Sequence, residues 1–131
     1  RILEMKLTFR KKVRVESGSH RSKIMTVQVQ TVRQLQGLLD LYRAGYQSSI
    51  IDQTVSKLVA LEIKHWQTEL QRLASRLVEY EQRYHMASAE FYRRFRSGEL
   101  GDDMDLVEWS VFWDMYQNTQ KRLDALTGNV P

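Results

Sequence analysis

The sequence predicts a mainly α-helical protein with one short strand near its N-terminus. The 131 residues include only 1 Pro and 6 Gly, so few positions would interrupt a helix. From about residue 32 onwards, apolar residues recur at the three- and four-residue spacing of an amphipathic helix. Residues 26–31 instead alternate between polar and apolar side chains, which is typical of a half-buried strand.

The expected strand has the sequence Thr-Val-Gln-Val-Gln-Thr. In a strand this alternation places Val27 and Val29 on one face, and the polar residues Thr26, Gln28 and Gln30 on the other. A strand must pair, and a two-stranded element is marginal unless helices pack on it. We therefore expect two chains to pair their strands in a homodimer.

Two helices should follow the strand. The first runs from about Val32 to Ala44, and Gly45 can adopt the left-handed conformation that ends it. Ser48 or Ser49 can then accept hydrogen bonds from the free N–H groups that open the second helix.

The second helix should continue to about Arg83 and carries a heptad seam. Its apolar residues recur at alternating spacings of four and three over more than three heptads. This seam packs either against later helices of the same chain or against a second chain as a coiled coil, and the sequence favours neither. The seam residues are Val59, Ile63, Trp66, Leu70, Leu73, Leu77, Tyr80 and Tyr84.

The C-terminal part should form a helical hairpin. A short helix begins near Ser88 and ends near Ser97, with Gly98 as its stop. A last helix begins at Asp102 or Asp103, where acidic side chains favour a helix N-terminus, and extends to about Leu126.

Basic residues are concentrated at the N-terminus. Residues 1–25 have a net charge of +6, whereas residues 26–131 have a net charge of −2. A basic arm of this kind often contacts the phosphates of nucleic acid, and Arg21 and Lys23 lie next to the expected strand. The alternative is that residues 1–24 are an upstream extension and that the natural chain starts at Met25.

Several classes of function find no support in the sequence. There is no Cys, so we expect neither disulfides nor thiolate metal sites. The His residues are scattered, and no nucleophile–base pair or phosphate-binding Gly loop is visible, so we expect no enzyme, catalytic residue or cofactor. The acids around Asp102 read as helix capping rather than as metal ligands. Without an apolar run of membrane-spanning length or a signal peptide, we expect a cytoplasmic protein.

Residues 26–62 resemble a ribbon-helix-helix module. The segment Gln-Ser-Ser-Ile-Ile-Asp at 47–52 stands where that family has a Ser-capped helix start, although the strand lacks the usual basic residue. The resemblance implies a DNA-binding dimer in which the outward strand residues enter the major groove, while the helix start at Ser48 and Ser49 faces phosphate. Gln side chains can bond bidentately to adenine there.

Residues 84–116 resemble small helical antitoxin-like proteins of bacteria and archaea, which are often encoded beside a toxin. The matching segments are Tyr-His-Met-Ala-Ser-Ala-Glu-Phe-Tyr at 84–92, Gly-Glu-Leu-Gly-Asp-Asp at 98–103 and Glu-Trp at 108–109. At Ala87 the chain departs from the Ser of this pattern, so Ser88 becomes the candidate helix cap.

These observations predict an antitoxin-like transcriptional regulator in three segments. Residues 1–25 form the basic arm, 26–62 the ribbon-helix-helix-like module and 63–131 a helical hairpin that binds a cognate toxin. The alternative is a helical coiled-coil interaction protein without DNA binding. The expected DNA-binding residues are Arg21, Lys23, Thr26, Gln28, Gln30, Ser48 and Ser49. The expected partner-binding residues are Phe91, Tyr92, Phe95, Asp102, Asp103, Trp109 and Trp113.

Overall fold

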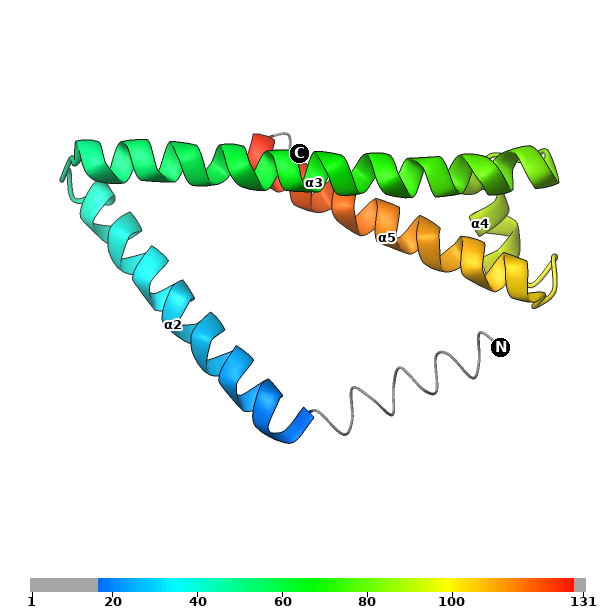
Figure 1. The fold of residues 1–131 in the computed structure, drawn as a ribbon, viewed down its shortest axis with the longest axis horizontal. Helices are drawn as coiled ribbons and strands as arrows, with labels where there is room; N and C mark the ends of the chain where they lie inside the picture. The colour runs from blue at the N-terminus through cyan, green and yellow to red at the C-terminus, as the bar shows by residue number, and fades with distance from the viewer. Residues whose placement is uncertain (1–16, 129–131) are drawn as a thin grey trace. The chain divides into compact units, whose positions relative to one another are not determined.

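The computed structural model describes residues 17–128, with side chains described from residue 23, and this part of the chain forms four helices (Figure 1). The mainly α class expected from the sequence is confirmed. The helices are α2 (Ser17–Arg43), α3 (Ser49–Tyr84), α4 (Ser88–Arg96) and α5 (Met104–Thr127). Most of the basic arm, expected over residues 1–25, lies outside the described residues.

The predicted strand at residues 26–31 is wrong. No strand occurs among residues 17–128, and these six residues lie inside α2. Each residue of an α-helix turns by about 100°, so Val27 and Val29 point to nearly opposite sides. The β-strand that a ribbon-helix-helix module requires at residues 26–31 is therefore absent. Six alternating residues are a weak signal beside helix-favouring neighbours such as Met, Gln and Leu, because a helix bonds its own backbone whereas a lone strand needs a partner.

The chain divides into two compact units, Arg1–Gln53 and Thr54–Pro131. In the described part of the first unit, α2 is followed by a turn and the first residues of α3. The second unit contains the rest of α3 together with α4 and α5.

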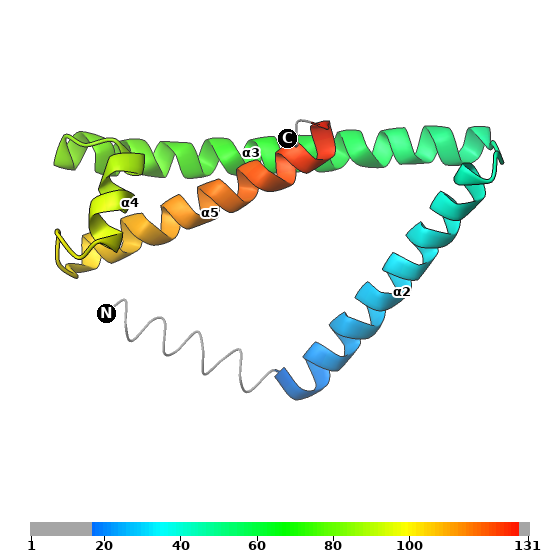
Figure 2. The same cartoon turned by 180° about the vertical axis from the view of Figure 1, so that it is seen from behind.

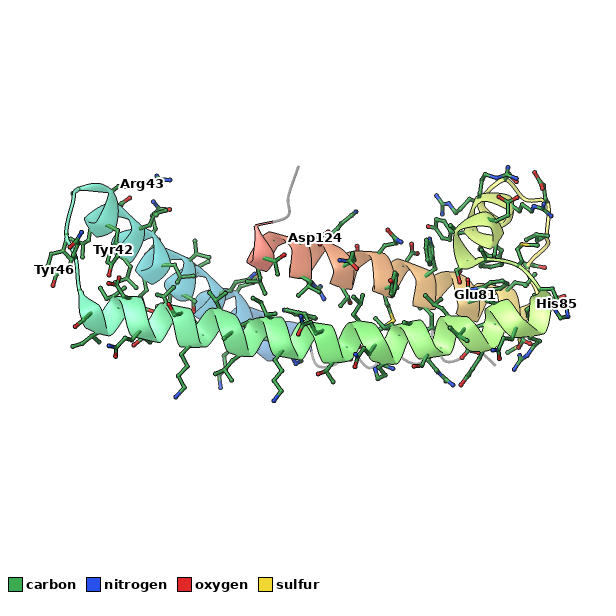
Figure 3. The ribbon with its side chains drawn as sticks, turned by 90° about the horizontal axis from the view of Figure 1, so that it is seen from above. Tyr42, Arg43, Tyr46, Glu81, His85 and Asp124 are labelled. Atoms are coloured by element: carbon green, nitrogen blue, oxygen red, sulfur yellow. The ribbon has the colours of Figure 1, made fainter. Side chains whose placement is uncertain are left out.

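The turn after α2 is held by Tyr42 (Figure 3). Gly45 has φ = +96°, the left-handed conformation expected of a helix stop. The Tyr42 hydroxyl lies 2.9 Å from the Ser48 carbonyl oxygen, which it can donate to, and it also reaches the Asp52 carboxylate. The Ser48 hydroxyl accepts a 3.4 Å hydrogen bond from the N–H of Ile51, which caps α3 as its sequence predicts.

In the second unit, α5 runs back along α3, and the short helix α4 lies between the end of α3 and the start of α5 (Figures 1 and 2). The core lies where these three helices meet, and its aromatic and aliphatic side chains come from all three. The predicted stops after α4 and α5 are confirmed, since Gly98 and Gly128 have φ of +83° and +75°. The buried core cluster consists of Leu77, Tyr80, Phe91, Leu106 and Trp109.

The heptad seam of α3 packs within its own chain where it is buried. Leu73, Leu77 and Tyr80 are the buried residues of α3, and the latter two belong to the core cluster shared with α4 and α5. The structure thereby decides between the two arrangements that the sequence left open, at least for this half of the seam.

Candidate protein-interaction surfaces

Trp109 is the centre of the second unit. Its side chain is 1% exposed and its ring stacks on Phe91, with ring centroids 3.7 Å apart. The indole N–H donates a 2.9 Å hydrogen bond to the Ser88 hydroxyl, and the Ser88 N–H donates to the Glu81 carboxylate at 2.9 Å. Glu81 lies near the end of α3 (Figure 3), so one chain of hydrogen bonds joins α3, α4 and α5.

Polar contacts at the rim fix α5 on α3. The Arg83 guanidinium lies 2.9 Å from the Asp105 carboxylate, and the Tyr84 hydroxyl donates to the same carboxylate at 3.1 Å. Farther along the pair, the Arg122 guanidinium lies 4.7 Å from the ring centroid of Trp66, a favourable cation–π distance. These contacts make the second unit a defined scaffold on which any surface residue has a fixed position.

Two titrating groups of this unit have strongly shifted pKa values. Burial, with the nearby Glu108 carboxylate adding to it, raises the pKa of Tyr80 to about 12. Hydrogen bonds from Arg93 and Arg94 lower the pKa of Glu90 to about 2. Burial and hydrogen bonds within the folded unit account for both pKa shifts.

The structure divides the expected partner-binding residues between core and surface. Phe91 and Trp109 are buried in the core, where they support the fold and face no partner. Tyr92, Phe95 and Trp113 are half-buried against that core, and the Tyr92 hydroxyl donates a 2.9 Å hydrogen bond to Asp114. Asp102 and Asp103 are exposed in the loop before α5.

The expected DNA-reading face is dispersed around a helix. Thr26 and Gln30 lie on one side of α2 and Gln28 lies on the other, because alternate residues are about 200° apart. Lys23 is exposed on α2, whereas the side chain of Arg21 is outside the described ones. Ser48 and Ser49 remain at the start of α3, where Ser48 caps the helix.

Several exposed apolar side chains of α2 form a stripe along one side of the helix. All residues from 23 to 41 are exposed, although helical spacing places six large apolar side chains within one side of the helix. Leu35, near the middle, is 55% exposed. We call these residues the α2 stripe: Ile24, Met25, Val32, Leu35, Leu38 and Leu39.

The first part of α3 also has exposed apolar side chains. Ile50 is 77% exposed in the first unit. Leu58 and Leu61, which belong to the second unit, are 54% and 57% exposed.

Sequence reasoning found only part of the α2 stripe. The helical spacing of the first expected helix places Val32, Leu35, Leu38 and Leu39 on one apolar face, together with Tyr42. Ile24 and Met25 were missed, because a strand was expected to separate them from that helix. Their signal is the spacing itself, since Met25, Val32 and Leu39 recur at intervals of seven.

Comparisons with protein-family models, with curated proteins and with solved structures gave no match.

Two further searches concern the described residues alone. None of their helices is both long and apolar enough to cross a membrane. Nor do three His, Asp or Glu side chains in this part of the chain gather closely enough to hold a metal ion.

Proposed function

We propose that this protein acts by binding another protein through the exposed apolar residues of α2. The observation that carries the proposal is the α2 stripe on a helix of 27 residues. Most helical stability in proteins comes from packing an apolar face against another element. A contiguous exposed apolar patch is typical of a protein-interaction site.

The second unit supplies the scaffold for this activity. Its own core buries Trp109 and Phe91 and is held by hydrogen bonds between its three helices. The interaction therefore needs no contribution from this core, and the exposed residues outside it remain open to a partner.

An antitoxin-like role is the specific form of this proposal. It comes from the resemblance of residues 84–116, and its partner would be a toxin encoded beside this chain. Operator reading through a strand forms no part of the proposal, because residues 26–31 are helical. The interaction protein without DNA binding is the better supported of the two functions that the sequence suggested.

The test is to express the full chain together with the product of the neighbouring reading frame. We expect the two proteins to copurify at a fixed ratio, and the chain to restore growth if the neighbour is toxic. Leu35→Asp should lose both effects, because it places a charge in the α2 stripe. The matched control is Gln30→Asp, which adds the same charge on the far side of the helix.

Equal copurification and growth with all three forms would contradict the use of α2 as the binding surface. Absence of any complex between the unsubstituted chain and its neighbour would contradict the antitoxin-like form.

A further inference from the structure

We infer that the α2 stripe binds the same stripe of a second copy of this chain, with the two helices parallel and in register. The inference rests on the proposed function in one respect, that the stripe is a protein-binding face. It goes further by pairing the stripe with a second copy in a stated alignment, so that the neighbouring gene product would bind the paired α2 helices rather than a single one.

The stripe has the pattern of a self-associating helix. Met25, Val32 and Leu39 recur every seven residues, and Gln28 and Leu35 stand three residues after the first two of them. These are the a and d positions of a heptad repeat, which form the seam of a coiled coil. At about 1.5 Å per residue, the a and d positions from Met25 to Leu39 span about 21 Å, which gives two such helices about two heptads of contact.

The charges on α2 favour a second copy over a strongly charged partner. Only four charged residues occur between positions 23 and 43, and only Arg43 stands at a position beside the seam. Like charges on two paired copies therefore have little opportunity to repel each other. A highly acidic or basic partner would find few complementary charges on this face. The four residues are Lys23, Arg33, Asp40 and Arg43.

Two polar residues on the same side of α2 as the stripe, Gln28 and Thr31, point to the alignment. The Thr31 hydroxyl already donates a 2.9 Å hydrogen bond to the Val27 carbonyl oxygen, so the donor of this side chain is satisfied within the helix. Gln28 is the polar residue at a d position, and its amide is both a donor and an acceptor. Two Gln28 side chains can bond to each other in a parallel, in-register pair, in which Leu35 also meets Leu35, whereas an antiparallel pair that brings Gln28 to Gln28 keeps the two Leu35 side chains apart. A polar residue at one seam position fixes register in this way, at some cost in stability.

Sedimentation equilibrium of the full chain, without any other protein, tests the pairing. We expect a dimer at micromolar concentration for the unsubstituted chain and for Gln30→Asp. Leu35→Asp should raise the dissociation constant by at least about tenfold, because two like charges would face each other in an apolar seam. Near-ultraviolet circular dichroism of the Trp residues, all of which lie in the second unit, verifies that its core remains folded.

Cross-linking tests the alignment, because the chain has no Cys and each introduced one is unique. In a parallel, in-register pair, Gln28→Cys and Leu35→Cys should each form an intermolecular disulfide rapidly, while Gln30→Cys should not. Positions 28 and 35 lie about 10 Å apart along the helix, so an antiparallel pair can bring at most one of them to its own copy.

A monomer at all concentrations would overturn the inference, as would equal cross-linking at positions 28, 30 and 35. Cross-linking at only one of positions 28 and 35 would overturn the parallel alignment. A monomer that still needs Leu35 to bind the neighbouring gene product would leave the proposed function standing without this inference. If the unsubstituted chain dimerises but the Leu35→Asp variant still binds that product, this inference stands and the proposed binding of the product through the stripe is contradicted.

Discussion

At the scale of single residues, Trp109 and Ser88 hold the second unit together. The indole is buried against Phe91 and uses Ser88 as its hydrogen-bond acceptor. A buried indole N–H that loses its partner keeps the cost of desolvation without compensation. The expectation that Ser88 caps α4 is wrong: Ala87 is the N-cap residue, α4 has no side-chain cap, and the Ser88 hydroxyl instead accepts the hydrogen bond of Trp109.

We predict that Ser88→Ala lowers the free energy of unfolding of the second unit by about 1–3 kcal/mol. Chemical denaturation followed by Trp fluorescence measures this loss. Ser75→Ala is the control, since the Ser75 hydroxyl donates only to the Gln71 carbonyl oxygen on the exposed side of α3. Similar losses for the two variants would show that the Trp109 hydrogen bond contributes nothing specific.

Tyr80 should make the second unit sensitive to alkali. Its pKa is about 12 in the folded chain against 10.0 for the free side chain. Between these values the unfolded chain loses the proton first, so stability falls as the pH rises. We predict a loss of roughly 2 kcal/mol by pH 12 from this residue.

The comparison of the unsubstituted chain with Tyr80→Phe isolates this effect. Denaturation at pH 9 and at pH 11.5 should give a steeper decline for the unsubstituted chain, because the variant has no proton to lose there. Parallel declines of the two proteins would contradict the prediction.

At the scale of elements, α4 is stabilised by charges placed in favourable order. Glu90 stands in its first turn and Arg93, Arg94 and Arg96 in its last, which complements the helix dipole. Glu90 also lies 2.9 Å from Arg93 and 2.8 Å from Arg94. These pairs are exposed, so each contributes modestly and salt weakens it.

We predict that acid removes the contribution of Glu90. Its folded pKa of about 2 lies below the free value of 4.5, so its contribution is full above pH 4.5 and falls away as the pH drops towards 2. Glu90→Gln should therefore be less stable than the unsubstituted chain at pH 7, and the difference should shrink by pH 2.5. Thermal unfolding at both pH values measures this, with Glu62→Gln as an exposed control. A difference that stays constant with pH would refute the assignment.

The elements also show how far local patterns reach. The ends of the three helices after residue 48 were predicted to within a few residues, because caps and stops such as Ser48, Gly98 and Gly128 act locally. The predicted strand at 26–31 was wrong. Its alternation covers only six residues, and a continuous helix satisfies the same backbone N–H and C=O groups without a partner strand.

At the scale of the whole molecule, the two units should respond differently to dilution. All three Trp residues belong to the unit Thr54–Pro131, whereas α2 belongs to the other. If α2 is held by a second copy, its helix content depends on protein concentration. The Trp environment, which arises within one chain, does not.

We predict that far-ultraviolet ellipticity per residue falls on dilution from about 50 μM to below 1 μM, while the Trp emission maximum stays constant. Leu35→Asp should show the lower ellipticity at every concentration. Ellipticity that is independent of concentration in both proteins would mean that α2 needs no partner to remain helical.

The helical class and most helix ends follow from local sequence, because propensity, caps and stops depend only on neighbouring residues. It also supplied the spacing of the α2 stripe, which becomes visible once residues 24–31 are placed in the helix. Which apolar residues are covered depends on how the folded helices pack. Leu77 and Tyr80 of the heptad seam share a core with Phe91 of α4 and Trp109 of α5, whereas Val32 and Leu35 remain exposed. Burial depends on contacts between segments far apart in the chain. Helical periodicity identifies an apolar face but does not specify which element packs against it.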